Sequence, residues 1–309
     1  MAHGDRAVVA VSGGIDSMVL LDLICRLSRG MRFFIVAAHV NHKLRGKASD
    51  GDEELVRDAA KRLGVAFEAA RRKPPRGKNL QDSARRLRYE FFAEVAGRHG
   101  AKVVCLAHHA GDQAETVLMH MLRGAGLSGL RGMACSSTHD GLRIVRPLLS
   151  ATRQEIARYA KERRIEYRED ETNAKLLYRR NSIRHRLIPL LREINPRIEE
   201  ALSEMASRLA DDDDAMNEVA MASRLEAALS STGLRVELRS GIYREFPASI
   251  RRRMLRQAFA SIAGSTKDLN SDQLCRMDEI ACSAKSKGEY RLPAGCQFSK
   301  DGGIISIRK

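Results

Sequence analysis

The sequence predicts an α/β protein with a mostly parallel sheet covered by helices on both faces, followed by a helical linker and a small C-terminal α+β domain. Two observations support this fold class. In the first half of the 309 residues, short apolar runs rich in β-branched residues alternate with longer stretches of helical periodicity. Apolar residues make up 43% of the chain, which is enough for a sizeable core and excludes wholesale disorder. Such sheets bind ligands at the carboxyl ends of their strands, so we expect the functional site there.

Strand and helix signals alternate along the first half of the chain. Strands are expected at residues 6–12, 33–40, 65–70 and 102–109. Helices are expected after them, at residues 15–27, 52–64, 80–98 and 110–123. The helix over 52–64 begins with acidic residues that suit its dipole and ends at a glycine. This order predicts that successive strands run parallel and are connected by helices.

The second half is mainly helical and then becomes rich in strand signals. An amphipathic helix is expected over 152–164, with Thr152 or Ser150 as its cap. Residues 198–229 have helical character, with an interruption expected at the four aspartates 211–214, near which a domain boundary is placed. We expect three parts, which are a first domain at 1–197, a helical linker at 198–230 and a small α+β domain at 231–309.

The charge of the chain indicates a polyanionic partner. Lys and Arg number 54 against 39 Asp and Glu, which gives a net charge of +15 and an isoelectric point of about 9.9. Clustered cations displace counterions from a phosphate backbone, so nucleic acid is favoured over a basic surface kept only for solubility. No tryptophan is present and aromatic residues make up 5%, which argues against base-stacking sheets as the main RNA contact.

Other broad classes are disfavoured by the same composition. The longest apolar run, 33–40, is far shorter than the ~20 residues that span a bilayer, and no signal peptide is expected before the first strand. The six cysteines contain no CxxC pair, so we expect reduced thiols in a cytoplasmic protein.

The segment SGGIDS is the strongest local motif. Its residues are Ser12, Gly13, Gly14, Ile15, Asp16 and Ser17, placed where the first strand turns into the first helix. Two glycines allow a ligand to approach the backbone, and the N–H groups of the helix start together with two hydroxyls can hold a phosphate. The loop has no lysine and is therefore not of the Walker type. An ordinary capped turn is the alternative interpretation.

Two further segments follow strand ends at the same edge of the sheet. After the strand 33–40, Asn41, His42 and Arg45 could contact nucleotide or substrate, or could be structural. After the strand 102–109, His108 is followed by Asp112 and Glu115, one turn apart on a helix. Such a group suits Mg²⁺–ATP coordination or proton transfer, whereas a protein-held zinc lacks a clear third partner. Acids at a solvated helix start remain the alternative, above all for Asp112.

Glycines and basic residues around this site allow further hypotheses. Residues 124–129 match GxGxxG, but they follow a helix instead of a strand, so we interpret them as a flexible loop beside the nucleotide site. Residues 71–88 contain eight Lys or Arg and one acid, and residues 175–197 contain seven and one acid. These two stretches predict a track for an RNA backbone. Arg85 and Arg86 are expected to face solvent, and Arg251, Arg252 and Arg253 are expected to extend the track.

Taken in order, these motifs resemble the tRNA(Ile)-lysidine synthase family of the PP-loop ATP pyrophosphatases. The matching segments are AVSGGIDS, HVNHKLRG with the acids 52–54, ARRLRYEFF, AHHAGDQAETVLMHMLRGAGLSGLRGM, RPLL and EDETNAKLLYRRNSIRHRLIPLL, over roughly residues 7–197. The resemblance implies a Rossmann-like PP-loop catalytic domain at 1–197. It also implies a reaction in which ATP adenylates carbon 2 of the wobble cytidine of a CAU-anticodon isoleucine tRNA. Free L-lysine then displaces AMP and leaves lysidine.

The resemblance also implies roles for single residues. It assigns ATP binding to the loop 12–17 and to His39, Arg123 and Gly124, with Asp16 near the phosphates and a Mg²⁺ ion. It places Asp16, Arg88, His108, Asp112 and Glu115 at the reaction centre. It assigns lysine or tRNA contacts to Asn41, His42, Arg45, Arg179, Arg180, Asn181 and Arg184. The oligomeric state is left open, a homodimer included.

The sequence departs from the family pattern at one position of the site. The family often has two adjacent acids where Gly111 and Asp112 stand here, so a role of the first acid has no carrier. Many members also have a further C-terminal domain beyond the part that corresponds to this chain.

Two other functions compete with this hypothesis. A PP-loop tRNA thiolase would share the ATP chemistry but usually needs a cysteine pair or cluster ligands, and no CxxC occurs here. A non-catalytic module that binds nucleotide and RNA would need the loop without the acid cluster. Release of pyrophosphate from ATP in the presence of lysine and tRNA discriminates the three.

Overall fold

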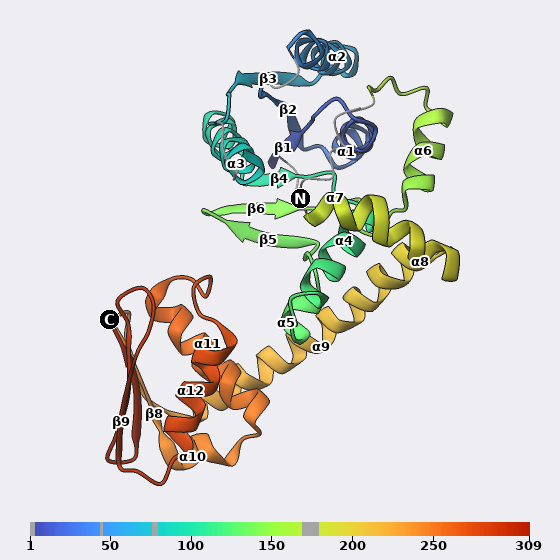
Figure 1. Ribbon diagram of the computed structural model, residues 1–309. Helices are drawn as coiled ribbons and strands as arrows, with labels where there is room; N and C mark the ends of the chain where they lie inside the picture. Colours follow the sequence, from blue (N-terminus) through green and yellow to red (C-terminus); the bar gives the residue numbers. More distant parts are fainter. Residues whose placement is uncertain (1–3, 44–45, 76–79, 169–178) are drawn as a thin grey trace. The chain divides into compact units, whose positions relative to one another are not determined.

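The computed structural model describes residues 4–43, 46–75, 80–168 and 179–309 (Figure 1). The chain divides into two units, Met1–Ala210 and Asp211–Lys309. In the described part of the chain, no helix is long and apolar enough to cross a membrane.

The first unit contains a six-stranded sheet in the order β3-β2-β1-β4-β6-β5. Its strands are β1 (Arg6–Ala10), β2 (Phe34–Asn41), β3 (Ala66–Arg71), β4 (Val103–Cys105), β5 (Ser136–His139) and β6 (Leu142–Val145). All neighbouring strands are parallel except β5, which runs antiparallel to β6 at the edge. The mostly parallel sheet predicted from the sequence is confirmed.

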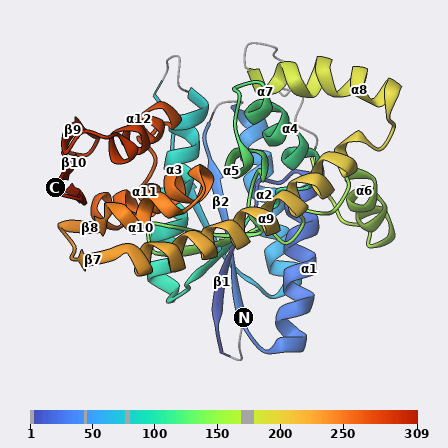
Figure 2. The same cartoon turned by 90° about the horizontal axis from the view of Figure 1, so that it is seen from below.

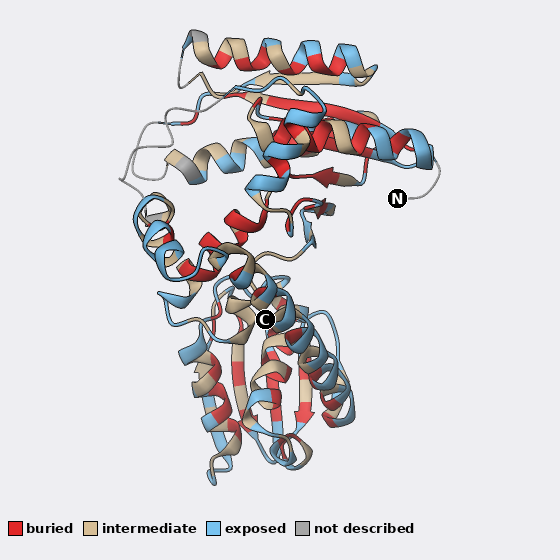
Figure 3. Cartoon of the chain, turned by 90° about the vertical axis from the view of Figure 1, so that its right-hand side faces the viewer, coloured by how far each residue is buried: buried red, intermediate tan, exposed pale blue. Residues whose placement is uncertain are grey.

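Helices cover both faces of this sheet, as Figures 1 and 2 show around β1 and β2. On one face, α1 (Ile15–Met31), α2 (Lys47–Leu63) and α6 (Arg153–Glu162) form a core with the odd-numbered residues of β1. On the other face, α3 (Leu80–His99) packs against Val8 and its even-numbered neighbours. Because alternate side chains of a strand point to opposite faces, a strand that is apolar throughout is buried on both sides (Figure 3).

Several predicted boundaries differ from the structure. The strand expected at 102–109 comprises only β4, since the chain then enters a loop and the helix α4 (Ala110–Met121), whose start is capped by His109. The two first helices are longer than predicted, because α1 continues to Met31 and α2 already begins at Lys47. The helix predicted at 152–164 is α6, capped by Thr152 in a capping box with Glu155.

Short helices complete the first unit beside α4. They are α5 (Leu127–Leu130), α7 (Arg179–Ser182), a π-helical turn η2 (Ile183–Leu187) and α8 (Ile188–Ile194). Apolar residues of α4, η2, α8 and the first part of the long helix α9 (Ile198–Ala227) form a small core of their own. Residues 169–178, which begin the last of the segments that resemble the family, lie outside the described residues.

The second unit is an antiparallel sheet packed against helices. Its strands, in the order β7-β8-β11-β10-β9, are β7 (Ala228–Ser231), β8 (Arg235–Arg239), β9 (Lys287–Arg291), β10 (Gln297–Asp301) and β11 (Ile304–Arg308). The helices α10 (Ser240–Glu245), α11 (Ala248–Ala263) and α12 (Ser271–Cys282) bury one face of this sheet together with the last part of α9. This agrees with an α+β character.

Two expectations about this unit are wrong. The aspartates 211–214 do not interrupt α9, because Asp213 is buried and pairs with Arg253 at 2.8 Å, which satisfies its charge inside a continuous helix. Arg251 is likewise bonded to Asp278, at 2.7 and 3.0 Å. Two of the three arginines expected on the RNA track are therefore internal ion-pair partners.

Candidate active site

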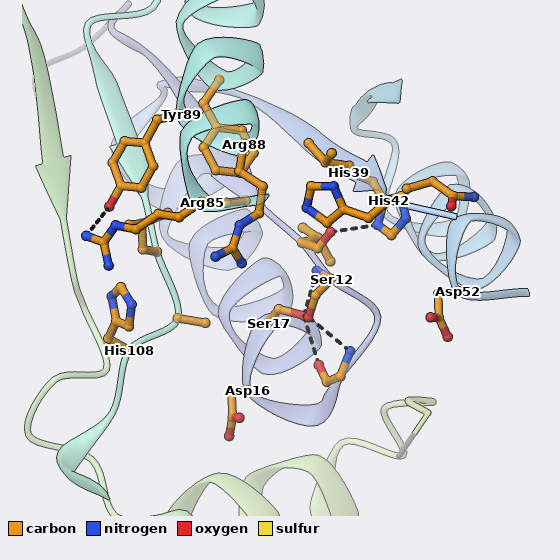
Figure 4. A pocket seen from close by; sticks show the side chains of 18 of the residues that line it. Ser12, Asp16, Ser17, His39, His42, Asp52, Arg85, Arg88, Tyr89 and His108 are labelled. Carbon is orange, nitrogen blue, oxygen red and sulfur yellow. Dashed lines mark hydrogen bonds between the residues drawn. The ribbon is translucent and has the colours of Figure 1, made fainter. Parts of the chain in front are cut away.

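A cavity of about 410 Å³ opens at the carboxyl ends of β1, β2 and β4, where the sequence predicts the site (Figure 4). The residues that line it come from these strands, the loop 12–17, α2 and α3. They include Ser12, Gly14, Asp16, Ser17, His39, Asn41, His42, Asp52, Arg85, Arg88, Tyr89, Phe92, Leu106 and His108.

The loop 12–17 is tied together by its own hydroxyls. Ser17 Oγ donates to the carbonyl of Gly14 at 2.9 Å, and the backbone N–H of Ser12 donates to Ser17 Oγ at 3.0 Å. Gly13 has a φ of +95°, and a Cβ there would lie 3.3 Å from Cβ of Asp52, so this turn requires a glycine. The loop thus brings the N-terminus of α1, with its free N–H groups, to the cavity as an anion-binding element.

Asp16 combines a half-buried position with an unsatisfied oxygen. Its Oδ1 is buried without a hydrogen-bond partner, and its Oδ2 lies 3.9 Å from Nε2 of His109. A carboxylate oxygen that is buried and unpaired is costly unless a ligand supplies a donor or a cation. This arrangement fits a carboxylate that meets a cationic group of a bound ligand.

Two histidines of the β2 end are held as neutral rings. His39 Nδ1 and His42 Nδ1 each lie 2.8 Å from a backbone carbonyl, of Val11 and Arg72 respectively. Burial lowers the pKa of both histidines. The second ring nitrogen of each is buried without a partner, so both rings can form a further hydrogen bond to a ligand.

The neighbouring residues of this segment are less available. Asn41 is almost fully buried and donates from Nδ2 to Glu53 Oε2 at 3.0 Å and to the Ser49 carbonyl at 3.1 Å. Although Asn41 lines the cavity, its amide is used to join β2 to α2. Arg45 lies outside the described residues.

Helix α3 contributes two arginines from the same face, and Figure 4 shows where they point. The guanidinium of Arg88 is directed toward the loop at Ser12 and Ser17. Arg85 is exposed, as predicted, but it also lines the cavity and donates to the hydroxyl of Tyr89 at 3.3 Å. His108 lies opposite, and burial lowers its pKa to about 4, so the ring is neutral at pH 7.

The acid pair of α4 is engaged by two arginines instead of facing the cavity. Arg180 Nε lies 2.6 Å from Glu115 Oε2, and Arg184 Nε contacts Glu115 Oε1. Both guanidiniums also reach Asp112 Oδ1, each at 3.2 Å. Burial acts against ionisation of Asp112, but the charges of His109 and Arg180 hold its pKa below the usual value. These four residues form a closed ion-pair network, in which Arg180 and Arg184, predicted to contact lysine or tRNA, bind the two acids predicted at the reaction centre.

His109 joins this network to the loop. The ring Nδ1 of His109 accepts a hydrogen bond from the backbone N–H of Gly111 at 3.0 Å. The backbone N–H of His109 donates to Asp112 Oδ2 at 3.2 Å. The opposite ring nitrogen, Nε2, points to Asp16 and Asp112, at 3.9 and 3.6 Å. Asp112 therefore caps the start of α4, as the alternative interpretation of an acid at a helix start predicts, and it also belongs to the ion-pair network.

The remaining predicted residues lie outside the cavity lining. Arg123 and Gly124 are exposed and follow the C-terminal end of α4, at the other end of this helix from His109. Arg179 and Asn181 lie in α7, and the side chain of Arg179 is outside the described residues. Their predicted roles stay predictions.

Sequence reasoning missed four residues that shape the site. They are His109, Asp52, Tyr89 and Arg168, whose backbone N–H donates to the Gly13 carbonyl at 3.0 Å and whose Nε lies 3.4 Å from Asp52. His109 carried a local signal, since a polar residue directly before a helix with an acid three positions later indicates a capping box, and Asp52 and Tyr89 lie within segments that resemble the family. The contact of residue 168 with the loop depends on tertiary structure alone.

Comparisons with known proteins agree with the fold of the first unit. A family model described as a PP-loop domain matches residues 2–191. A tRNA(Ile)-lysidine synthase of Geobacter sulfurreducens is 39% identical over 302 residues, which are 94% of this chain and 62% of that protein. A tRNA(Ile)-lysidine synthase of Symbiobacterium thermophilum is 34% identical over 307 residues, which are 96% of this chain and 64% of that protein. The chain thus spans less than two thirds of the length of these relatives.

A solved structure shares the fold. The U34-tRNA thiolase NcsA from Methanococcus maripaludis, with its [4Fe-4S] cluster, matches with a TM-score of 0.56 at 17% identity and covers 68% of this chain and 73% of that chain. At this level of identity the likeness concerns the fold alone.

Proposed function

Because the chain belongs to the PP-loop domain family, we propose that it uses ATP to ligate L-lysine to carbon 2 of the wobble cytidine in a CAU-anticodon isoleucine tRNA. The product would be lysidine, with AMP and pyrophosphate released. The observation that carries the proposal is the cavity itself, which joins the phosphate-binding loop to Arg88 and His108. The names of the relatives, which match over most of this chain, support the same reaction.

The proposed reaction has two steps in one cavity. In the first, O2 of the cytosine attacks the α-phosphorus of ATP, a P–O bond forms, and the bond to the leaving pyrophosphate breaks. In the second, the ε-amine of lysine attacks carbon 2, and the C–O bond to AMP breaks while the amine loses a proton. The loop 12–17 would hold the phosphates, and the Arg88 guanidinium would stabilise the charge that develops on them.

Asp16 is the residue best placed to meet a Mg²⁺ ion that accompanies the triphosphate. Its unpaired Oδ1 fits a hard oxygen ligand. Among the described residues no group of three His, Cys, Asp or Glu side chains is arranged to hold a metal ion, so the phosphates would have to supply other ligands. When bound, the ion would neutralise phosphate charge, and Asp16 would hold it beside the loop.

The lysine amine would approach the acids of α4. In the closed network, Asp112 has its Oδ1 on Arg180 and Arg184 and its Oδ2 toward His109. We propose that Asp112 contacts the lysine amine through Oδ2, on the side of Asp16, while Glu115 holds the two arginines. This gives the two acids different roles.

The thiolase alternative lacks support from the cysteines. Cys105 lies at the end of β4 near the site, but burial raises its pKa to about 11, so it is a thiol at neutral pH and a poor nucleophile. The described cysteines also form no cluster that could ligate iron.

The test is an assay of lysine incorporation. With ATP and labelled lysine, we expect label to enter isoleucine tRNA with a CAU anticodon, accompanied by AMP and pyrophosphate in equal amounts. Methionine tRNA, which has the same anticodon, is the matched control. Incorporation of sulfur, or release of pyrophosphate without transfer of lysine, would contradict the proposal.

A further inference from the structure

One end of the cavity carries positive charge that no carboxylate balances. Within the described part of the chain, neither Arg85 nor Arg146 has an acid within ion-pair distance. Arg146, in the RPLL segment after β6, is 8% exposed and binds the Ala134 carbonyl at 2.8 Å and Ser137 Oγ at 3.1 Å. Its Nε is buried without a partner. The guanidinium of Arg146 thus has neutral hydrogen-bond partners but no acid among the described residues, and a buried positive charge of this kind favours an anion nearby.

Tyr89 links these two arginines. Its hydroxyl accepts from Arg85 at 3.3 Å and also interacts with Arg146, and the Arg85 guanidinium lies 5.2 Å from the centre of its ring. Tyr89 is fixed in turn by an edge contact with His139, at 4.8 Å between ring centres. Arg85 is therefore an exposed residue that contact with Tyr89 holds at the rim of the cavity.

This positive end differs from the phosphate-binding loop. Arg88 faces the loop, whereas Arg85, one turn earlier on α3, faces Tyr89 and His108 (Figure 4). His108 contributes a buried Nδ1 without a partner on the same side. Asp112, whose charge acts on His108, is already paired with Arg180 and Arg184. The cavity thus has two cationic ends, and the triphosphate of ATP needs only the end at the loop.

We propose that Arg85, supported by Tyr89 and Arg146, binds a backbone phosphodiester next to the nucleotide whose base enters the cavity. The planar guanidinium fork suits a phosphate with two oxygens. An enzyme that modifies a base must bring it out of its stack into a pocket, and a phosphate contact at the rim fixes the extruded nucleotide. The inference rests on the proposed function only for the identity of the RNA.

The test compares Arg85→Gln with Arg86→Gln. Arg86 is the next residue of the same helix, but it is 71% exposed in its side chain, pairs with Glu90 at 3.6 Å and does not line the cavity. Binding of a CAU anticodon stem-loop is measured by fluorescence anisotropy without ATP or lysine, over 50 to 200 mM salt. We expect Arg85→Gln to weaken binding about tenfold and to reduce the log–log salt slope by about one, with Arg86→Gln close to wild type.

A modified RNA locates the phosphate. Methylphosphonate linkages on either side of the wobble nucleotide should weaken binding to the wild type and have no further effect on Arg85→Gln. Arg146→Lys keeps the charge but loses the fork, so its affinity for the unmodified RNA should lie between those of the wild type and Arg85→Gln. Thermal unfolding checks that this variant is folded.

Three outcomes would overturn the inference. They are equal effects of the Arg85 and Arg86 variants, a loss of ATP affinity with RNA affinity intact, or the same methylphosphonate penalty in wild type and Arg85→Gln. Lysidine formation by the wild-type protein is measured separately, so a failure of the proposed reaction is distinguished from a failure of the phosphate contact.

Discussion

At the scale of single residues, Asp16 illustrates how the site is prepared for a ligand. One oxygen lies near His109 and the other is buried and unpaired. Because the described protein gives the second oxygen no partner, the carboxylate is expected to act on bound ligand instead of on the fold.

Replacement of Asp16 by asparagine tests this role. The exchange keeps the shape of the side chain and removes its charge beside the phosphates, so adenylation should fall about 10²–10³-fold while thermal unfolding stays near wild type. Pyrophosphate release from ATP in the presence of tRNA is the measurement. Asp58→Asn, an exposed position on α2, is the matched control, and near-normal AMP formation by Asp16→Asn would refute the assignment.

The buried histidines predict a dependence of stability on pH. Burial lowers the pKa of His39 and His42, and that of His108 to about 4. Between the unfolded value near 6.5 and the folded values, the unfolded chain binds more protons, so the free energy of unfolding falls as the pH falls. Each group contributes at most about 1.4 kcal/mol per pH unit.

Urea unfolding of the whole protein at pH 7 and pH 5 gives the free energy of unfolding at each pH and so measures this dependence. His108→Asn, which cannot titrate, should lose less stability between these two pH values than the wild type. An identical loss in both proteins would mean that His108 does not contribute.

At the scale of elements, the contact between α4 and the segment of α7 and η2 rests on charge. Glu115 is 3% exposed in its side chain and holds Arg180 and Arg184. A π-helical turn at 183–187 carries Arg184, and such turns often mark functional sites. The ion-pair network thus holds α7 and η2 against α4, whose N-terminal cap is His109.

Replacement of Glu115 by alanine should therefore destabilise the protein as well as reduce activity. It leaves two partly buried guanidiniums with Asp112 as their remaining acid partner, and the loss of charged hydrogen bonds costs about 1.5–3 kcal/mol. Chemical denaturation gives the free energy of unfolding. As a control, Glu94→Ala breaks an exposed pair with Arg72 and should cost about 0–1 kcal/mol. A fully stable but inactive Glu115→Ala would instead support a direct catalytic role.

At the scale of the whole molecule, the surplus of +15 charges should govern encounter with RNA. With ~6–10 phosphates neutralised, tRNA affinity should fall about 10³–10⁵-fold between 50 and 200 mM salt. The loss should be similar for cognate and non-cognate tRNA, since phosphate contacts carry no base information. Filter binding over a salt series measures it, and affinity that is independent of salt would leave the charge without a role in RNA binding.

The sequence predicted the parts of this molecule that depend on local pattern. The turn at 12–17 was predictable because two glycines and flanking hydroxyls lie between a buried strand and a helix. Contacts between distant residues were not predictable in this way. Arg180 and Arg184 meet Glu115 from 65 and 69 residues away, and spacing alone does not tell which of Arg85 and Arg86 faces the cavity. The interruption predicted at 211–214 was wrong for the same reason, because the distant residue Arg253 forms an ion pair with Asp213.

The cap of α4 restricts the side chains that fit at position 111. A Cβ at Gly111 would lie 2.7 Å from Cε1 and 3.1 Å from Nδ1 of the His109 ring, which the cap hydrogen bond holds in place. A side chain at 111 would therefore displace the His109 ring, whose Nε2 lies 3.9 Å from Asp16 Oδ2. The absence of a side chain at 111 thus keeps the cap of α4 in contact with the loop 12–17.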